Sequence, residues 1–570
     1  MDTKQKQLIV DSKQTVISLV QICHLKGIRK IVFSPGSRNA PLIIAFNEHG
    51  GFETFSIHDE RSAAFFALGM AQQTGETVAI ISTSGSASLN YAPAIAEAFY
   101  QRIPLLVLTA DRPPEWIDQG DSQTMRQRNL YQNFIKKSFE IRYETTNMDE
   151  LWYNSRMYNE AINDTRIEPK GPVHINIPLR EPLYLFEKNF EDKSLAKIFD
   201  QVSPPPQLSV KVMDELAIVW NECRRKLILC GITPKSKALN DVLVRIADDP
   251  SVIVLTETTS NLGDESFIEQ IDRILFSIQP EDHETYKPDL LLTFGTNIVS
   301  KKIKSLFRTW EIPEHWHVDE TDVVIDTYKK LTKHLRCDLL IFFEELLSRR
   351  KVANSEYRQA WQTKNTAIKF NHIEFMEQAS WSDLLAYSMV ISQLPKNTGL
   401  QMANSTAVRY VQLMDKRADI SYHANRGVAG IDGCSSTAVG AAWATEQMTV
   451  LVTGDTAFLY DSNALWIPYL SANLRIVIFN NQGGNIFRFI PGPDTTPYLE
   501  QFFEAHHQIE SGYLAKTFNI PYYKATDEDE LSACLAEFWR PQVGNRPAIL
   551  EVFTPRFKND KMLKAYFRFL

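Results

Sequence analysis

The stretch 449–487, TVLVTGDTAFLYDSNALWIPYLSANLRIVIFNNQGGNIF, predicts a strand, a helix and a second strand in succession. Residues 449–453 form a short, largely β-branched run, which is typical of a buried strand. Apolar residues recur at helical spacing over 458–470, and 474–479 form a second apolar run. Such a unit predicts two parallel strands joined by a right-handed crossover, and it favours an α/β fold.

Polar residues stand where each of these strands ends. Gly454 and Asp455 follow the first strand, and Asn480 and Asn481 interrupt the second. Because parallel neighbouring strands end at the same edge of a sheet, we expect Asp455 and Asn481 to lie close together. A carboxylate, an amide oxygen and a free backbone carbonyl form an oxygen site that suits Mg²⁺ once phosphate oxygens complete the octahedron. Either dipeptide by itself is also a common turn signal.

The composition is that of a large globular protein. The chain has 570 residues, which is too long for one hydrophobic core and favours three domains. The net charge of -8 argues against a dedicated nucleic-acid binder, but it does not exclude a local basic pocket for an acidic substrate. Six scattered cysteines, no signal peptide and no apolar run near the ~20 residues of a membrane span lead us to expect a cytoplasmic enzyme.

In the first third of the chain, polar residues follow the ends of predicted strands. Ser37 and Arg38 suit a carboxylate or a phosphate, or else they are a helix cap and a surface arginine. Glu60, Arg112 and Gln123 also follow strands, and a glutamate there can simply favour a helix N-terminus. The alternation of strands and helices predicts a doubly wound parallel sheet. We expect a helix over 8–25 and strands over 30–33, 55–58, 77–82, 105–110 and 171–178.

The Pro-rich segment 203–206 marks a domain boundary. Lys301 and Lys302, in the middle third, form either a solvated helix face or a basic site. A polar helix over 344–366 leads toward the last domain. Strands of the middle third are expected over 226–230, 252–256 and 289–294. We therefore predict three domains, at 1–190, 205–350 and 375–570.

The last third repeats the strand–helix theme before the stretch 449–487. Ser405 and Arg409 follow a predicted strand at 400–403, and their i, i+4 spacing places them on one face of a helix. The Gly-rich stretch 423–433 contains Arg426 and one bulky aliphatic residue, Ile431.

Six motifs together resemble the thiamine-diphosphate decarboxylase superfamily. Within it they are most similar to the family of 2-succinyl-5-enolpyruvyl-6-hydroxy-3-cyclohexene-1-carboxylate synthases of the menaquinone pathway. The resemblance covers essentially the whole chain, although the middle third contributes little. Thr456 departs from the superfamily, which often has Gly or Ala there. The motifs are PGSRNAPL (35–42), HDER (58–61), TSGSA (83–87), LTADRPPE (108–115), NRGVAGIDG (425–433) and NNQGGNIF (480–487).

The resemblance implies a thiamine diphosphate cofactor and Mg²⁺, for which Mn²⁺ can substitute. Glu60 would hydrogen-bond the pyrimidine ring of the cofactor and act in general acid–base catalysis. Ile431 would wedge beneath the cofactor, unless it is ordinary core packing. The other implied residues are Ser405, Gly454 and Thr456 at the phosphates, and Asp455, Asn481 and the Gly483 carbonyl at the metal.

The resemblance also implies the reaction. The carbanion equivalent from decarboxylation of 2-oxoglutarate would add to isochorismate, and both substrates are dicarboxylates. Lys302 stands where the family usually has an arginine, whose planar fork suits carboxylates. The family forms homodimers or homotetramers with active sites between subunits. The implied substrate residues are Ser37, Arg38, Arg112, Gln123, Lys302, Arg409, Arg426, Ile486 and Phe487; Arg38, Arg409 and Arg426 are also implied to be catalytic.

Two other functions fit this sequence less well. Another thiamine-diphosphate enzyme, such as an acetolactate synthase or a 2-oxoacid decarboxylase, has simpler substrates and less need of arginines after strand ends. An alternative from another class is a non-catalytic interaction protein that keeps the fold. The presence of Glu60, Asp455 and Asn481 argues against it.

Overall fold

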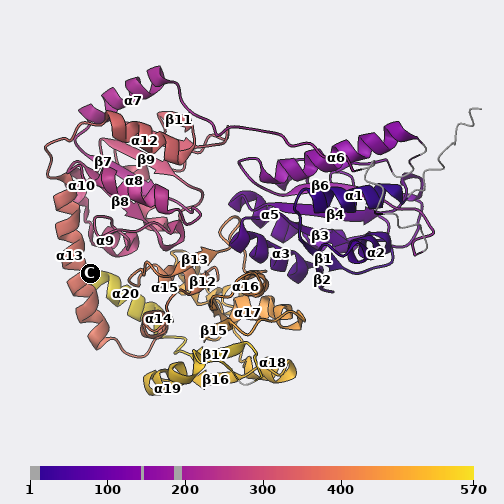
Figure 1. Cartoon of the computed structure of the whole chain (residues 1–570). Coiled ribbons are helices and arrows are strands. Elements are labelled where there is room, and N and C mark those ends of the chain that lie inside the picture. The colour runs from indigo at the N-terminus through magenta and orange to yellow at the C-terminus, as the bar shows by residue number, and fades with distance from the viewer. Residues whose placement is uncertain (1–12, 143–144, 146, 185–189, 191–195, 543) are drawn as a thin grey trace, which may run out of the picture. The chain divides into compact units, whose positions relative to one another are not determined.

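The computed structural model describes the chain except for residues 1–12, 143–144, 146, 185–189, 191–195 and 543. Within the described residues, three parallel sheets are each flanked by helices, which confirms the predicted class of three doubly wound α/β domains (Figure 1). By its internal contacts the chain forms two compact units. The first unit comprises residues 1–203, 427–446 and 461–471, and the second comprises 204–426, 447–460 and 472–570. The predicted boundaries of three domains stay a prediction.

The first unit contains a parallel sheet with strands β1 (Lys30–Ser34), β2 (Glu53–Ser56), β3 (Val78–Ser82), β4 (Leu105–Asp111), β5 (Ser138–Glu140) and β6 (Val173–Pro178). Their order across the sheet is β2-β1-β3-β4-β6-β5. The helices are α1 (Gln14–Leu25), α2 (Ala40–His49), α3 (Glu60–Thr74), α4 (Ser86–Asn90), α5 (Ala92–Gln101), α6 (Met148–Arg166) and α16 (Cys434–Trp443). Of the helix expected over 8–25, α1 covers 14–25, and the expected residues 8–12 lie outside the described residues.

The second unit contains two sheets. The middle sheet has strands β7 (Lys226–Cys230), β8 (Val252–Thr256), β9 (Leu290–Phe294), β10 (Glu314–Asp319) and β11 (Lys333–Arg336) in the order β11-β10-β9-β7-β8. Separate hydrophobic clusters cover its two faces. One face packs on α7 (Val210–Glu222), α8 (Lys237–Ala247) and α12 (Leu339–Arg349), and the other on α9 (Ile271–Ser277), α11 (Lys301–Thr309) and α13 (Tyr357–Gln378).

The third sheet has strands β12 (Gly399–Met402), β13 (Ser421–Ala424), β14 (Thr449–Gly454), β15 (Leu474–Asn480), β16 (Tyr522–Ala525) and β17 (Ala548–Phe553). Their order is β13-β12-β14-β15-β17-β16. The remaining α-helices are α10 (His283–Tyr286), α14 (Asp383–Ser392), α15 (Ala407–Val411), α17 (Asp455–Tyr460), α18 (Gly512–Thr517), α19 (Glu528–Phe538) and α20 (Asn559–Phe569). None of the helices in the described ranges is long and apolar enough to cross a membrane.

Three predicted elements were wrong in extent. The helix expected over 458–470 is replaced by α17 and a short 3₁₀ turn at 462–466. Asp461 leaves the helical backbone, and its carboxylate accepts the Ser436 amide at 2.7 Å and the Ser436 hydroxyl at 2.8 Å. The helix expected over 344–366 is two helices, α12 and α13. Lys351 lies between them and donates its backbone amide to the Asn221 side-chain oxygen at 2.7 Å, which interrupts the helix. The strand expected over 55–58 ends earlier, at Ser56.

Two glycines let α3 and α16 approach each other closely within the first unit. A Cβ atom on Gly69 would lie 2.0 Å from the Thr437 carbonyl oxygen, and one on Gly440 would lie 1.9 Å from that of Phe66. Real Cβ contacts are never this short, so only glycine fits at these crossing points. This packing fixes the helix that begins with Glu60 against the helix that follows the Gly-rich stretch.

Candidate active site

The ends of β14 and β15 bring the predicted metal residues to one edge of the third sheet. The strands pair in parallel with Gly454 opposite Phe479, so the chain leaves the sheet at the same level after each. Asp455 is buried at the start of α17. The Gly483 amide, in the loop after β15, donates a 3.0 Å hydrogen bond to Oδ2 of Asp455.

Asn481 presents a buried oxygen at this edge. The residue is 4% exposed, and its Nδ2 donates to Oδ2 of Asp383 over 2.9 Å. Its Oδ1 is buried and has no hydrogen-bond partner among the described residues. Leaving a buried acceptor unpaired costs about 1–3 kcal/mol, and a bound cation removes that cost. The donor set therefore fits Mg²⁺, a hard cation that prefers oxygen ligands.

Asp383 fixes the direction of the Asn481 amide. It is fully buried at the start of α14, and its Oδ1 accepts a 2.6 Å hydrogen bond from the Thr554 hydroxyl. Burial raises the pKa of Asp383 to about 6. Because Asp383 accepts from the Asn481 nitrogen, it turns the Asn481 oxygen away from itself. Groups that orient a metal ligand in this way are typically worth about 10–100-fold in metal affinity.

The third predicted metal residue, Gly483, occupies a position that requires glycine. Its φ is +141°, and a Cβ there would lie 2.6 Å from the carbonyl oxygen of Glu504. The Gly483 carbonyl accepts the Asn485 amide at 2.9 Å, and one lone pair stays available to a cation. Glu504 is buried and pairs with Arg488 and Arg556, which holds the loop in place.

The predicted phosphate donors differ in their present partners. Both the amide and the hydroxyl of Thr456 donate to Oδ1 of Asp455. Gly454 has open space at its Cα, because a Cβ there would meet nothing within 4 Å. Ser405 has a φ of +72° and is half-buried. Thr456 thus orients the Asp455 carboxylate in this structure, whereas Gly454 leaves room for a ligand.

His507 is a neighbour of the Asp455 carboxylate that the sequence did not single out. Its Nε2 lies 3.6 Å from Oδ2 of Asp455, and this carboxylate raises the pKa of His507. The Gln482 carbonyl accepts the backbone amide of His507 at 3.3 Å, which places the imidazole beside the loop after β15. No motif in the sequence marks this residue.

Three of the predicted substrate residues line a cavity of about 470 Å³ in the second unit: Lys302, Arg409 and Ile486. Nη1 of Arg409 donates to the Val299 carbonyl at 3.4 Å, while its Nε is buried without a partner among the described residues. The Lys302 ammonium lies 5.1 Å above the ring of Phe276, which also lines the cavity. The cavity therefore combines cations with an apolar wall, as a carboxylate-bearing carbon skeleton requires.

A buried carboxylate anchors the start of the helix that carries Lys302. Glu257 accepts the backbone amides of Val299 and Ser300 at 2.7 Å each. Burial raises the pKa of Glu257 to about 7. The Ser300 hydroxyl caps α11 and also donates to Asp272, which lines the cavity. The alternatives for the lysine pair are a solvated helix face and a basic site. Lys301 is exposed and Lys302 is half-buried, and both line the cavity.

Arg426 and Phe487 lie outside the lining of this cavity. Arg426 donates through Nη1 to Oδ1 of Asn404 at 2.8 Å, and its carbonyl accepts from the Asn297 amide group at 2.5 Å. Phe487 packs against Phe503, with ring centroids 5.6 Å apart. The structure thus fixes both residues, but it does not bring them into the cavity with Arg409.

In the first unit, the predicted substrate residues follow β1 and β4. Arg38 is 6% exposed and donates to the Leu179 carbonyl at 2.8 Å, so the alternative of a surface arginine was wrong. Arg112 donates to the Ser122 carbonyl at 2.7 Å, and Ser37 lies beside Arg38 at the end of β1.

Close backbone contacts link this edge together. A Cβ on Gly36 would lie 2.5 Å from the Thr83 side chain, and one on Gly85 would lie 3.2 Å from the backbone of Gln123. The turns after β1 and β3 and the loop that carries Gln123 therefore meet at one edge of the first sheet.

Glu60 is the first residue of α3. Asp59 caps the helix by accepting the Ser62 amide at 3.1 Å. Glu60 is half-buried, and burial raises its pKa. A glutamate that merely favours a helix N-terminus would be a solvated anion, whereas partial burial stabilises the protonated carboxyl group.

Ile431 lies in the Gly-rich stretch. A glutamate on one of the helices that flank the first sheet anchors this stretch. Glu97, in α5, is buried and accepts the Val428 amide at 2.8 Å and the Gly427 amide at 2.5 Å. Ile431 is half-buried. Ile431 and Glu60 belong to the first unit and Asp455 to the second, so the predicted contacts of all three with one cofactor stay a prediction.

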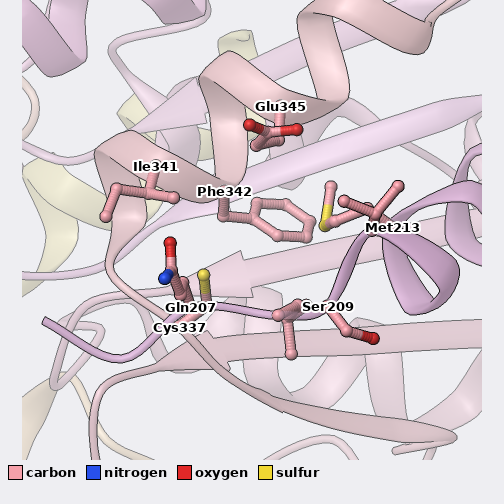
Figure 2. A pocket seen from close by; sticks show the side chains of 9 residues that line it. Gln207, Ser209, Met213, Cys337, Ile341, Phe342 and Glu345 are labelled. Atoms are coloured by element: carbon pink, nitrogen blue, oxygen red, sulfur yellow. The ribbon is translucent and has the colours of Figure 1, made fainter.

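Another cavity, of about 420 Å³, lies between α7 and α12 in the second unit (Figure 2). Phe342 and Met213 face each other across it, and Gln207 and Cys337 lie beneath them. The charged residue in its described lining is Glu345, which pairs with Arg349. None of the predicted substrate residues lines this cavity, and its charge does not suit an acidic substrate.

We expect Asp383→Ala to weaken cation binding, because the Asn481 amide then loses the acceptor that fixes its orientation. Cofactor binding is measured by calorimetry at increasing Mg²⁺. The Mg²⁺ concentration that gives half of the maximal thiamine diphosphate binding should rise by about 10–100-fold. Asp383→Asn should have a smaller effect, since its oxygen can still accept from Asn481. Asp249→Ala is the matched control: it removes a fully buried carboxylate from the turn between α8 and β8, away from the candidate site. An unchanged Mg²⁺ requirement in Asp383→Ala would contradict this role.

Comparisons with known proteins agree with the geometry. A family model described as thiamine pyrophosphate enzyme, N-terminal TPP binding domain, matches residues 15–130. A 2-succinyl-5-enolpyruvyl-6-hydroxy-3-cyclohexene-1-carboxylate synthase from Flavobacterium johnsoniae is 42% identical over 97% of this chain and 98% of its own length. Synthases of the same name from Porphyromonas gingivalis (40% identical; 98% of this chain, 97% of that protein) and Christiangramia forsetii (41%; 97% and 98%) are similar to it. The chain therefore belongs to the family of thiamine-diphosphate-dependent 2-succinyl-5-enolpyruvyl-6-hydroxy-3-cyclohexene-1-carboxylate synthases.

Proposed function

We propose that this chain decarboxylates 2-oxoglutarate with thiamine diphosphate and joins the remaining succinyl unit to isochorismate. The product is 2-succinyl-5-enolpyruvyl-6-hydroxy-3-cyclohexene-1-carboxylate, an intermediate of menaquinone biosynthesis. Family membership supports the reaction. The structural observation that carries the substrate class is the cavity that combines Lys302 and Arg409 with the apolar Ile486 and Phe276.

The third sheet would hold the metal and the diphosphate. Asp455, the Oδ1 atom of Asn481 and the Gly483 carbonyl would bind Mg²⁺, or Mn²⁺ in its place. Gly454, Thr456 and Ser405 would lie at the phosphates. Bound there, thiamine diphosphate supplies the carbanion chemistry for decarboxylation and for carbon–carbon bond formation. The buried, unpaired Asn481 oxygen supports this arrangement, because the chain itself provides no partner for it among the described residues.

Glu60 and Ile431 would position the other end of the cofactor. A carboxyl group with a raised pKa keeps its proton at higher pH, and Glu60 can then donate it to a ring nitrogen of the pyrimidine. Ile431 would support the bent shape of the cofactor from below. Its loop is held by Glu97, so a wedge at this place has a rigid base.

The substrates need cations that do not move when the carboxylates bind. Arg38, Arg112 and Arg426 each have a backbone or amide partner in this structure, which limits their motion. We propose that they bind substrate carboxylates together with Lys302 and Arg409, and that Arg38, Arg409 and Arg426 also contact the reacting groups. Ser37 and Gln123 would add hydrogen bonds, and Ile486 and Phe487 an apolar wall. Lysine at 302 keeps the charge but lacks the two-pronged geometry of arginine.

We further propose a homodimer or homotetramer with active sites between subunits, located in the cytoplasm. The cysteines support the location, because all six are free thiols, as a reducing compartment requires. The assembly follows the family.

An assay with purified protein, Mg²⁺ and thiamine diphosphate tests the proposed reaction. We expect CO₂ release from 2-oxoglutarate and consumption of isochorismate in equal amounts. The product should be detected by mass spectrometry. Isochorismate left intact while CO₂ is released would indicate a simple decarboxylase or another carboligase. Absence of CO₂ from every 2-oxoacid offered would indicate a non-catalytic protein.

We expect Glu60→Gln to lose turnover while it keeps cofactor affinity, because the amide has no acidic proton to transfer. Turnover at saturating cofactor should fall by about 10²–10⁴-fold. Glu76→Gln is the matched control, since Glu76 is an exposed glutamate that follows the end of the same helix. Near wild-type turnover of Glu60→Gln at saturating cofactor would remove Glu60 from the mechanism.

A further inference from the structure

The C-terminal helix α20 is anchored to the middle of the second unit by a buried hydrogen-bond network. Tyr566, on α20, is fully buried, and its hydroxyl lies 2.8 Å from Nδ1 of His372 on α13. Nη2 of Arg273, on α9, lies 3.0 Å from Nε2 of the same imidazole. Arginine has no acceptor, so His372 must accept at Nε2 and donate from Nδ1 to Tyr566. Burial and Arg273 lower the pKa of His372 to about 4, in agreement with this neutral form.

Further contacts hold the same helix. Arg273 donates to the Leu413 carbonyl at 2.5 Å and pairs with Asp415 at 2.7 Å, just beyond α15. The ring of Phe567, on α20, stacks on that of Phe276, on α9, with centroids 3.8 Å apart and planes inclined by 21°. The position of α20 is thus fixed by side chains from α9 and α13, and Arg273 of α9 is itself held by the segment after α15.

One face of this anchored helix lines the cavity that contains Lys302 and Arg409. Residues 563, 564, 567 and 568 recur at helical spacing and all belong to its lining. Two of them are cations, Lys564 and Arg568, and both are exposed. Lys564 lies 3.4 Å from Asp560, whose side chain is 16% exposed, so this lysine has one carboxylate neighbour just outside the described lining.

The charge of the cavity is strongly unbalanced. Its described lining contains Lys301, Lys302, Arg409, Lys564 and Arg568 against a single carboxylate, Asp272. That carboxylate is engaged, because it accepts from the Ser300 hydroxyl and interacts with Arg409 and Lys302. The described lining supplies no carboxylate to the cations of α20, and Asp560 can balance only one of them, so an incoming anion would meet an excess of positive charge.

We propose that α20 is the specificity wall of the substrate cavity, and that Lys564 and Arg568 bind a carboxylate of the acidic substrate opposite Lys302 and Arg409. This inference rests on the proposed function, because it names further residues of the same substrate site. The phenylalanine stack between α9 and α20 gives that wall its apolar part. Both substrates carry such a carboxylate, and the experiment distinguishes them.

The test uses the full-length holoenzyme with Lys564→Ala, Arg568→Ala and the double variant. Lys561→Ala is the matched control, since Lys561 is an exposed lysine of the same helix outside the cavity lining. We expect the double variant to raise KM at least tenfold for the substrate whose carboxylate is bound, with kcat within about twofold. The charge-conserving pair Lys564→Arg and Arg568→Lys should restore most of the loss. Which KM rises, that of 2-oxoglutarate or that of isochorismate, identifies the carboxylate.

A binding experiment without turnover makes the outcome independent of the proposed reaction. Glutarate, an unreactive dicarboxylate, should bind the wild type and lose at least tenfold in Kd in the double variant. Butyrate, which carries one carboxylate, should bind both proteins equally. The inference is overturned if KM for both substrates stays within twofold, if Lys561→Ala has the same effect, or if glutarate does not distinguish the proteins. A wild type that binds glutarate selectively but consumes neither substrate would contradict the proposed function alone.

Discussion

The parallel pairing of β14 with β15 is the constraint on which the candidate site depends. It brings Asp455 and the loop after Asn480 to one edge of the sheet, although they are distant in the sequence. Pairing alone does not decide which atom of Asn481 faces the site. The hydrogen bond to Asp383 does, because it engages the nitrogen and leaves the oxygen buried and without a partner among the described residues. A buried oxygen of this kind is stabilised by a cation.

The second unit also contains a cationic cavity. Lys302 lines it from α11, which packs on the middle sheet, and Arg409 and Ile486 line it from α15 and from the turn after β15. Glu257 holds the first of these segments, and the network around Arg273 holds the C-terminal helix. The helices that pack on the middle sheet therefore supply part of the charged lining, through Lys302, and the aromatic support for α20, through Phe276.

Local patterns predicted the buried strands well. β7 and β8 have the predicted bounds, and β14 and β15 extend the predicted strands by one residue, because apolar runs end sharply at polar or Gly-rich turns. β10 was not predicted, since its buried His315 and His317 interrupt the apolar pattern; Thr293 bonds both of them. The predictions of single helices over 344–366 and 458–470 were wrong. In the first, a distant side chain accepts a backbone amide, and in the second, a polar residue turns inward. No local pattern records either contact.

The same distinction holds for the site. Asp455 and Asn481 were predictable because they follow strands whose pairing the topology dictates. Asp383, Glu257 and the cations of α20 were not, because each acts through a contact with a segment far away in the sequence. Sequence motifs thus predicted candidate ligand-binding residues at strand ends, while the residues that orient them and the cations of α20 emerged only from the tertiary structure.

We infer that Asp455, Asn481 and Gly483 form the metal site. Anomalous X-ray diffraction from crystals grown with Mn²⁺ and thiamine diphosphate tests it most directly. We expect one strong manganese peak bonded to Asp455, to the Asn481 side-chain oxygen and to the Gly483 carbonyl. A cofactor bound without a peak there, or a peak coordinated by other residues, would contradict it.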